Sequence, residues 1–492
     1  MITAHHVFSA LSKLTCGYAI LVFNMLRFYN TLTRQKEELK PIHEGKIGMY
    51  SCGPTVYWFA HIGNMRSFLF ADVLRRTLEL NGYEVKQVMN ITDVGHLTGD
   101  TDDGEDKMIV AMKREGKTAY EIAEFYTSAF KKDLEALNIK PANIYPKATD
   151  HIAEQIEMIE ALEKNGFTYQ TSDGVYFDTS KLADYGRLSG QKAQEKLAGA
   201  RVEMGEKRNA TDFALWKFSP STPRQARDSG HQPHERLMEW DSPWGKGFPG
   251  WHIECSAMSL KYLDVPFDIH TGGIDHIAVH HENEIAQTMG AEGVLQANVW
   301  MHNEFLTVDN GKMSKSLGNL FTLDELAAKG YDPIAFRYLV LGGHYRSKLN
   351  FTFEALDAAQ NALHKLRETI RSWKTPGTIG CADLENEFLA ALNDDLGTPQ
   401  ALAVVWKLID IDLPTEVKAK TLLWMDRVLG LRLEETLGRA LDVPPQVQEL
   451  VAAREEARKQ KDWARSDELR DRIHELGYSV EDTDQGPHIK SL

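Results

Sequence analysis

The order of apolar and polar positions near the start of the chain predicts a strand, a helix and a second strand. Gly45–Tyr50 reads as a short strand with alternating apolar residues. Apolar residues then recur at three- and four-residue spacing, which predicts an amphipathic helix: Met65, Phe68, Leu69, Val73, Leu74 and Leu78. Asn81-Gly82 is a helix stop signal, and Val85–Ile91 is a second apolar strand. This unit is typical of a parallel sheet, which binds ligands at the carboxyl ends of its strands.

The loop between the first strand and the helix carries side chains suited to chemistry. Cys52 offers a thiolate and His61 an imidazole. Gly63 stands at the start of the helix, where backbone N–H groups can meet a phosphate. A thiolate and a phosphate seat about a dozen residues apart indicate a nucleotide reaction next to a metal.

Two short motifs resemble the signatures of the class I aminoacyl-tRNA synthetases. His61–Asn64 (His-Ile-Gly-Asn) resembles the first signature, usually written HIGH, and Lys312–Ser316 (Lys-Met-Ser-Lys-Ser) matches the second in full. Alone, the first would more often be an ordinary helix cap and the second a solvated turn. Both occur in the order found in the family, which favours the functional interpretation. The two lysines, Lys312 and Lys315, can bring positive charge to a triphosphate.

The first signature departs from the family at its last position. Asn64 stands where the family has histidine. An amide still donates hydrogen bonds but carries no charge, so the departure questions a cation at this position and leaves the phosphate seat intact.

Four residues far apart in the sequence form a candidate metal-ligand set. Cys52 and Cys255 supply two thiolates, and His280 and Glu284 lie four residues apart on one helix face. Two thiolates, one imidazole and one carboxylate suit tetrahedral zinc, and their spacing fits no zinc finger. Because the spacing fits no zinc finger, a purely structural zinc ribbon is the weaker interpretation. Taken singly, a buried cysteine is usually a small hydrophobe, and a helical His–Glu pair is usually a surface contact.

This constellation resembles the cysteinyl-tRNA synthetases, whose zinc ligands correspond to the same four positions. The resemblance extends from about Met25 to the C-terminus through four further motifs: Asn90–Asp93, Gly250–Met258, His280–Gln287 and His344–Ser347. It implies ATP with Mg²⁺ and one Zn²⁺ per chain as cofactors, and L-cysteine and tRNA(Cys) as substrates. We also expect a cytoplasmic monomer with no membrane partner.

Zinc offers a physical basis for telling cysteine from serine. An apolar pocket cannot strongly reject the smaller hydroxyl analogue. A metal lowers the pKa of a bound thiol enough to hold a thiolate, whereas a serine hydroxyl stays protonated and binds poorly. We therefore expect no editing site, and no accumulation of a misacylated serine product.

The resemblance also assigns roles in a two-step reaction. The cysteine carboxylate attacks the α-phosphorus of ATP, giving cysteinyl-adenylate and pyrophosphate, and the 3′-terminal ribose of the tRNA then takes the aminoacyl group. The α- and β-phosphates are assigned to His61 and Asn64, with Gly63 beside them. The leaving pyrophosphate is assigned to Lys312 and Lys315, together with Mg²⁺. Asp275 follows a strand and two glycines, which suits ribose hydroxyls. Candidate contacts to the amino acid are Thr55, Thr92 and Trp251.

Length and composition set the domain organisation. With 492 residues, 42% of them apolar and 26% charged, the chain is expected to form two to four globular domains. Its net charge of −15 argues against nonspecific polyanion binding but not against a tRNA held by local basic patches. Four cysteines make no disulfide framework, and a reducing cytoplasm fits them.

The expected fold class is α/β. A Rossmann-like parallel-sheet catalytic domain is split by an insertion and followed by an α-helical bundle and a small C-terminal anticodon-binding module. The expected boundaries are 25–125 and 243–345 for the catalytic domain, 126–242 for the inserted connective domain, 346–440 for the bundle and 441–492 for the module. Residues 1–24 are expected to be a dispensable extension, with targeting as the alternative. The Pro- and Gly-rich loop 219–239 has no assigned function.

The C-terminal stretch Ala457–Arg470 is rich in charge, and such a helix is usually a solvated face. Here it resembles the anticodon-binding module of the family. Trp463 lies among cations that include Arg465, and it could stack an unpaired base.

Two other functions fit part of the pattern. A cysteine ligase acting on a small amine would share the zinc and both signatures but would need no anticodon module. A non-catalytic zinc-containing RNA-binding protein would leave the lysine motif unexplained. ATP–pyrophosphate exchange with cysteine, followed by acylation with and without tRNA, distinguishes the three.

Overall fold

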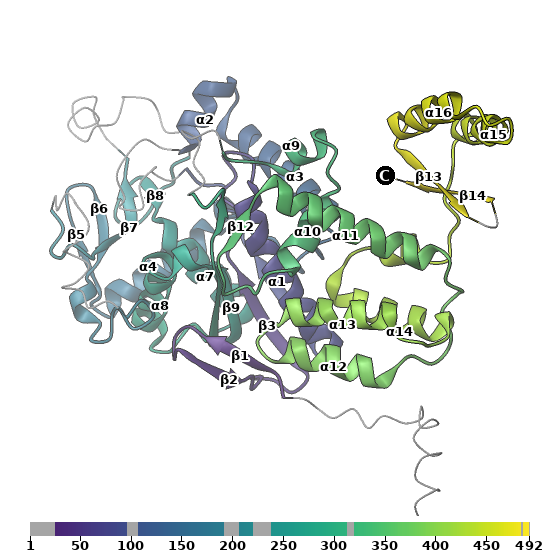
Figure 1. The fold of residues 1–492 in the computed structure, drawn as a ribbon. Coiled ribbons are helices and arrows are strands. Elements are labelled where there is room, and N and C mark those ends of the chain that lie inside the picture. Colours follow the sequence, from purple (N-terminus) through teal and green to yellow (C-terminus); the bar gives the residue numbers. More distant parts are fainter. Residues whose placement is uncertain are drawn as a thin grey trace, which may run out of the picture. The chain divides into compact units, whose positions relative to one another are not determined.

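The computed structural model describes residues 25–95, 107–190, 206–219, 238–311, 319–483 and 486–491. The chain forms two compact units (Figure 1). The sheet unit comprises Phe23–Thr352 together with Leu389–Ala401, and the helical unit contains Phe353–Phe388 and Leu402–Leu492. None of the helices in the described ranges has the length and apolar character needed to cross a bilayer.

The sheet unit is built around four parallel strands in the order β10-β9-β3-β4. Their bounds are β3 (Lys46–Ser51), β4 (Glu84–Met89), β9 (Phe267–Gly273) and β10 (Ala297–Asn303). The helix α1 (Ile62–Leu80) connects β3 to β4, and α8 (His280–Glu292) connects β9 to β10. The strand–helix–strand unit predicted from the sequence is therefore confirmed, and the fold is the expected α/β type with a parallel sheet.

Alternating side chains divide the core between the two faces of the sheet. One face packs against α1, in a cluster that includes Met49, Ile269, Met301, Leu74 and Leu78. The other face packs against α7 (Trp251–Leu263) and α8, in a cluster that includes Tyr50, Phe267, Trp300, Met258 and Ile285. Figure 1 shows α1 and α7 on opposite sides of the strands. Adjacent residues such as Met49 and Tyr50, or Trp300 and Met301, thus lie on opposite faces, as alternation along a strand requires.

The inserted region carries its own antiparallel sheet in the order β5-β6-β7-β8. The helices of this region are α3 (Ala119–Ala136) and α4 (Ile152–Lys164), and the strands of its sheet are β5 (Thr168–Gln170), β6 (Gly174–Phe177), β7 (Phe213–Phe218) and β8 (Gly247–Pro249). The strand expected around 173–178 is thus present as β6. The last strand, β8, is separated from α7 (Trp251–Leu263) by a single residue.

Shorter elements complete the sheet unit. They are β1 (Arg27–Asn30), β2 (Gln35–Glu38), α2 (Lys107–Glu115), the 3-10 turns Ala148–His151, Thr179–Lys181 and Ile274–His276, β11 (Leu306–Val308), α9 (Leu323–Ala328), α10 (Pro333–Leu341) and β12 (Leu349–Phe351). β11 and β12 form a separate parallel pair.

The helical unit contains most of the predicted bundle and a C-terminal module. Its elements are α11 (Phe353–Arg371), α12 (Ala382–Asn393), α13 (Thr398–Asp410), α14 (Thr415–Leu429), the 3-10 turn Leu433–Glu435, α15 (Pro445–Lys459), α16 (Trp463–Glu475), β13 (Tyr478–Thr483) and β14 (Gly486–Ser491). In the module, α15 and α16 share a core with the β13–β14 hairpin, formed by Val447, Leu450, Val451, Leu469 and Ile473 with Tyr478 and Val480.

One segment that is distant in sequence groups with the sheet unit. It is Leu389–Ala401, the end of α12 and the start of α13. The reason is a buried carboxylate. Asp395 accepts hydrogen bonds from the Tyr29 backbone N–H at 2.8 Å and from the Tyr345 hydroxyl at 2.6 Å. Arg346 also pairs with it.

Candidate metal centre and nucleotide site

The loop after β3 extends the edge of the sheet beyond the regular strands. The Gly53 N–H donates to Asn90 Oδ1 at 2.8 Å, and a Cβ at this glycine would lie 1.7 Å from the Asn90 carbonyl oxygen. Only glycine permits this approach. Thr55 then lies beside Thr92 in a parallel bridge. Cys52, Thr55 and Thr92 therefore stand together at the carboxyl edge of the sheet.

Four candidate metal ligands converge at this edge from two helices and a loop. The donor cluster consists of Cys52, Cys255 from α7, and His280 and Glu284 from α8; its donor atoms all lie within 4.8 Å of one another. Glu284 Oε1 lies 3.2 Å from His280 Nε2 and 3.8 Å from Cys52 Sγ. The four residues proposed from the sequence are therefore brought together, and Cys255, His280 and Glu284 are buried.

A second set of donors overlaps the first. His270 and His281 join Cys52 and Glu284 within the same distance limit. His281 Nε2 lies 3.2 Å from Cys52 Sγ, and its Nδ1 lies 2.7 Å from His302 Nε2. Sequence reasoning missed both histidines. The signals available in the sequence were the position of His270 at the end of the predicted strand Phe267–His270 and the placement of His281 directly after His280.

Other buried groups orient the ligands of the donor cluster. Glu284 Oε2 lies 2.9 Å from His270 Nε2 and accepts a hydrogen bond from Gln296 Nε2 at 3.0 Å. This leaves Oε1 directed at the other donors. His280 Nδ1 lies 2.9 Å from His252 Nδ1, so the ring is held through the nitrogen that does not approach Glu284. Such outer partners fix ligand orientation and raise metal affinity.

The electrostatics of the donor cluster fit a cation. Burial raises the pKa of the Cys52 thiol well above its usual value, and Cys255 and Glu284 raise it further. Burial also holds the pKa of His280 well below its usual range, so the imidazole is neutral. A divalent cation would displace the thiol protons and bind the neutral imidazole. This donor set suits zinc, for which thiolate, imidazole and carboxylate are the usual ligands.

The first signature forms the N-terminus of α1. His61 is the N-cap: its Nδ1 accepts from the Asn64 N–H at 3.2 Å, and Asn64 Oδ1 accepts from the His61 N–H at 3.1 Å. The two side chains thus close a reciprocal capping box. Asn64 therefore has a local structural role here. The first turn of the helix, which includes Gly63, presents its N–H groups and the positive end of the helix dipole.

The remaining candidate contacts differ in their surroundings. The Trp251 ring lies with its centroid 4.5 Å from that of His280, so it packs directly beside the donor cluster. Thr92 is buried, and its hydroxyl donates to Glu254 Oε2 at 2.9 Å. Asp275 follows Gly273, is exposed, and stands just past the end of β9.

Comparison with known proteins identifies the family. The model of the class I (C) tRNA synthetase catalytic domain matches residues 38–361, and that of the cysteinyl-tRNA ligase anticodon binding domain matches residues 441–489. A cysteine–tRNA ligase of Burkholderia lata is 52% identical over 94% of this chain and 96% of that protein. One of Treponema denticola is 44% identical over 93% and 98%.

The chain belongs to the cysteine–tRNA ligase family. It is a class I aminoacyl-tRNA synthetase, as the sequence predicts, and the family binds ATP. The methionyl-tRNA synthetase of Mycobacterium tuberculosis, solved with methionyl-adenylate, shares the fold: its TM-score is 0.51 at 16% identity, over 80% of this chain and 91% of that chain.

The second signature of this ligase lies outside the described residues, since Lys312 and Lys315 fall within 312–318. Its flanks are described. Before it, β11 pairs with β12. After it, the Phe321 carbonyl accepts from the Ile62 N–H at 2.9 Å. The chain thus passes from the second signature to the first turn of α1, which carries the first signature.

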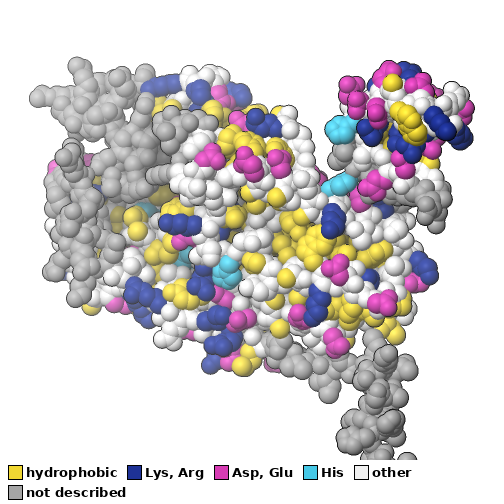
Figure 2. All heavy atoms as spheres, viewed as in Figure 1, with side chains coloured by type: hydrophobic (Ala, Val, Ile, Leu, Met, Phe, Trp, Pro, Cys, Tyr) yellow, Lys and Arg dark blue, Asp and Glu magenta, His cyan; other side chains and the backbone are white. Residues whose placement is uncertain are grey.

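The C-terminal module of this ligase exposes an aromatic side chain among charges. Trp463 is 58% exposed, and the Arg458 guanidinium carbon lies 5.8 Å from its ring centroid. Arg465 pairs with Glu468 at 2.6 Å. Figure 2 shows acidic and basic side chains mixed over α15 and α16. Trp463 therefore offers an exposed stacking surface, and no charge of one sign dominates this face.

Proposed function

We propose that this protein joins L-cysteine to tRNA(Cys) through a cysteinyl-adenylate intermediate, and that zinc holds the thiol of the substrate. The observation that carries the proposal is the donor cluster at the carboxyl edge of the sheet, where Cys52, Cys255, His280 and Glu284 lie within 4.8 Å of one another. Membership of the cysteine–tRNA ligase family supports the same substrates.

The chain's own residues prepare the amino-acid site. Zinc, when bound by the donor cluster, lowers the pKa of a coordinated thiol, which favours cysteine over serine. His270 and Gln296 keep the Glu284 carboxylate turned toward the ligands. Trp251 packs on His280 and forms an aromatic wall for the substrate. Thr55, half-buried at the edge of the sheet, is our candidate for the amino-acid backbone, and Thr92 contributes by holding Glu254.

The nucleotide is proposed to bind at the start of α1. The cysteine carboxylate attacks the α-phosphorus of ATP, and the bond to the pyrophosphate oxygen breaks as the adenylate forms. The helix N-terminus with His61, Gly63 and Asn64 supplies donors to the α- and β-phosphates. Lys312 and Lys315 are proposed to stabilise the leaving pyrophosphate, with Mg²⁺ as counter-ion. Asp275 is the candidate for the ribose hydroxyls, and its exposed position past β9 suits that role.

The C-terminal module is proposed to bind the anticodon of tRNA(Cys). Trp463 is exposed enough to stack a base, and Arg465 lies on the same helix. The match of residues 441–489 to the family's anticodon binding domain supports this role. The boundaries expected from the sequence, a monomeric state and a cytoplasmic location remain part of the proposal.

One pair of assays tests the function. Purified protein should catalyse cysteine-dependent ATP–pyrophosphate exchange and should then charge bulk tRNA with cysteine, and serine should support neither reaction. Exchange without charging of tRNA would favour a ligase that acts on a small amine. The absence of exchange, with RNA binding retained, would favour a non-catalytic zinc protein. Charging with serine would contradict selection by the metal.

A further inference from the structure

Arg66 is a buried cation that binds the main chain. It lies two residues after Asn64 on α1 and is 1% exposed. Its two terminal nitrogens donate to five carbonyl oxygens, which together with Arg66 are called here the Arg66 cluster: Glu304 (2.8 Å), Phe305, His344 (3.3 Å), Tyr345 (3.4 Å) and Ser347. Burial lowers the pKa of Arg66 to about 10, and the nearby Glu304 raises it. The side chain remains a cation at neutral pH, solvated by carbonyls in place of water.

These carbonyls mark the start of the β11–β12 pair. Phe305 directly precedes β11, and Ser347 stands two residues before β12. The strands are also tied to each other there, because the Leu349 N–H donates to the Phe305 carbonyl at 3.2 Å. The Glu304 N–H donates to the Tyr345 carbonyl at 2.8 Å. Arg66 thus fixes the point at which two chain segments enter this small ladder.

The first turn of α1 therefore contacts the chain on both sides of the second signature. Arg66 binds the backbone ahead of β11, and the Ile62 N–H binds the Phe321 carbonyl beyond it. Both contacts are made by residues within five positions of His61, the N-cap of the same helix. A shift of α1 relative to β11 would move the proposed phosphate seat relative to 308–311, the described residues that lead into the second signature.

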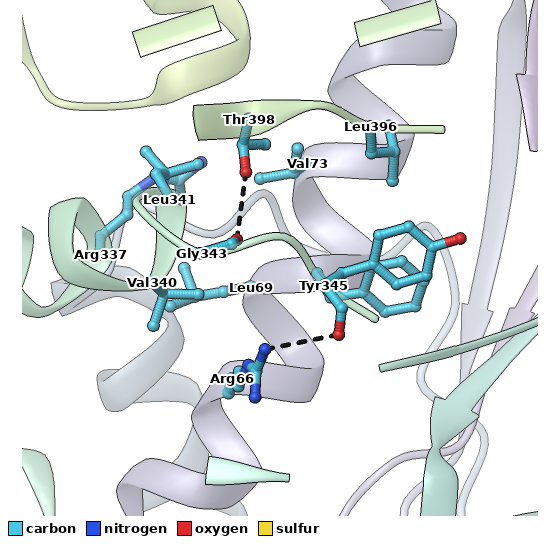
Figure 3. Close-up of a pocket in the computed structure, with 11 residues that line it drawn as sticks. Arg66, Leu69, Val73, Arg337, Val340, Leu341, Gly343, Tyr345, Leu396 and Thr398 are labelled. Atoms are coloured by element: carbon cyan, nitrogen blue, oxygen red, sulfur yellow. Dashed lines mark hydrogen bonds between the residues drawn. The ribbon is translucent and has the colours of Figure 1, made fainter. Parts of the chain in front are cut away.

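Packing alone does not hold this junction. A mainly apolar pocket of about 30 Å³ adjoins it, lined by residues of α1 and α10. Figure 3 shows Arg66 and Tyr345 among the residues that line this pocket. Its apolar lining includes Leu69, Val73, Val340, Leu341 and Leu396. The directed hydrogen bonds of Arg66 add a positional constraint to these apolar contacts.

We propose that Arg66 is a positioning residue for the adenylate-forming step. It sets the position of the start of α1 relative to the β11–β12 pair. The donors at the start of α1 and the proposed lysines that follow β11 in the sequence can then bind the same triphosphate. This inference rests on the proposed function. Guanidinium is required because its planar fork spreads donors over separate nitrogens that reach several carbonyls at once, whereas an ammonium has all three donors on one nitrogen. A misplacement of about 1 Å can slow a reaction by about 100-fold.

The test is the variant Arg66→Lys, measured by ATP–pyrophosphate exchange with cysteine. We expect kcat to fall about 10- to 100-fold, while KM for cysteine and the zinc content change less than about twofold, because the donor cluster lies at other elements. The matched control is Arg76→Lys. Arg76 is also buried on α1, where it pairs with Asp72 at 2.8 Å and donates to the Asn138 carbonyl. The Arg76→Lys variant should lose about as much thermal stability as Arg66→Lys, but its kcat should stay within about twofold of wild type.

A second variant acts on the segment that supplies three of these carbonyls, through the side chains of Tyr345 and Arg346. Asp395→Asn weakens the contacts that hold Tyr345 and Arg346, and should lower kcat in the same direction by a smaller factor. It carries the test if Arg66→Lys does not fold. Equal kcat in Arg66→Lys and Arg76→Lys, or an unchanged kcat in Asp395→Asn when Arg66→Lys is unfolded, would overturn the inference. Inactive wild-type protein would instead contradict the proposed function.

Discussion

The donor cluster and the Arg66 cluster both bury polar groups in the sheet unit, but they do so by different means. In the donor cluster, side chains from separate elements meet one another. In the Arg66 cluster, one side chain meets carbonyls that any residue could supply. The first arrangement depends on residue identity at every position. The second depends on identity at one position and on the fold at the rest.

The largest effect is expected from replacing one of the four ligands of the donor cluster, because only a particular side chain can supply its donor atom. Cys255→Ser replaces a thiolate by a hydroxyl, which stays protonated and is a poor zinc ligand. Loss of an outer partner of a metal ligand costs about 10- to 100-fold in affinity. Loss of a ligand should therefore lower both zinc affinity and cysteine-dependent exchange by at least about 100-fold. Metal analysis by mass spectrometry and the exchange assay measure the two effects.

The matched control is Cys381→Ser, at a half-buried cysteine of the helical unit. It should retain zinc and full exchange. A Cys255→Ser protein that keeps one zinc per chain and normal exchange would show that the donor cluster is not the metal centre.

The next effect separates phosphate chemistry from metal binding. Lys315→Ala removes a proposed transition-state donor, and such losses slow reactions by about 100- to 1,000-fold. We expect exchange to slow by about 100-fold or more while zinc content stays unchanged. Rapid-quench measurement of adenylate formation gives the rate of the step directly. Near-normal exchange in this variant would remove Lys315 from the mechanism and leave the donor cluster untouched.

The contrast between the two clusters also explains what the sequence can predict. The helix α1 follows from apolar spacing: Met65, Phe68, Leu69, Val73, Leu74 and Leu78 are all buried as predicted. The donor cluster is predicted because thiolate, imidazole and carboxylate are chemically marked. The reciprocal capping box of His61 and Asn64 does not follow from the motif, because two side chains must meet at the start of α1 in the folded chain.

The missed features depend on contacts between distant parts of the chain. Periodicity does not give the strand order β10-β9-β3-β4, on which the meeting of His270 with Glu284 depends. The grouping of Leu389–Ala401 with the sheet unit comes from Asp395, which looks like an ordinary polar residue in a turn. In the sequence, Arg66 looks like any cation on an amphipathic helix. Its partners are backbone carbonyls, which every residue carries, so no residue type marks them.

A smaller effect is expected one step out from the ligands. Gln296→Met removes one of the two contacts that hold Glu284 Oε2, while His270 remains. Zinc affinity should fall about tenfold, as measured by competition with a chelator. The control is Gln155→Met, at a buried glutamine that donates to the Ala148 carbonyl at 2.9 Å. Equal zinc affinity in the two variants would mean that Gln296 serves packing alone.

The smallest effect concerns a buried carboxyl group whose surroundings disfavour its ionised form, unlike the surroundings of the charged groups in either cluster. Asp133 on α3 is buried, and burial raises its pKa to about 7; the nearby Asp324 raises it further and Lys132 lowers it. The unfolded chain ionises this group near pH 4. The folded protein therefore retains the proton between about pH 4 and about pH 7, and its stability falls as the pH rises through that range.

Asp133→Asn removes this titration and keeps the shape of the side chain. The melting temperature of the variant minus that of wild type should therefore rise by a few degrees between pH 5 and pH 8 and then level off. The donor-cluster variants above, by contrast, should change metal binding at both pH values. In Asp324→Asn the neighbouring negative charge is gone, so Asp133 ionises more easily and the pH dependence should shrink. A constant difference between Asp133→Asn and wild type across this range would mean that the carboxyl is already ionised in the folded protein. Its burial would then be offset by donors, as it is for the carboxylate of Glu284.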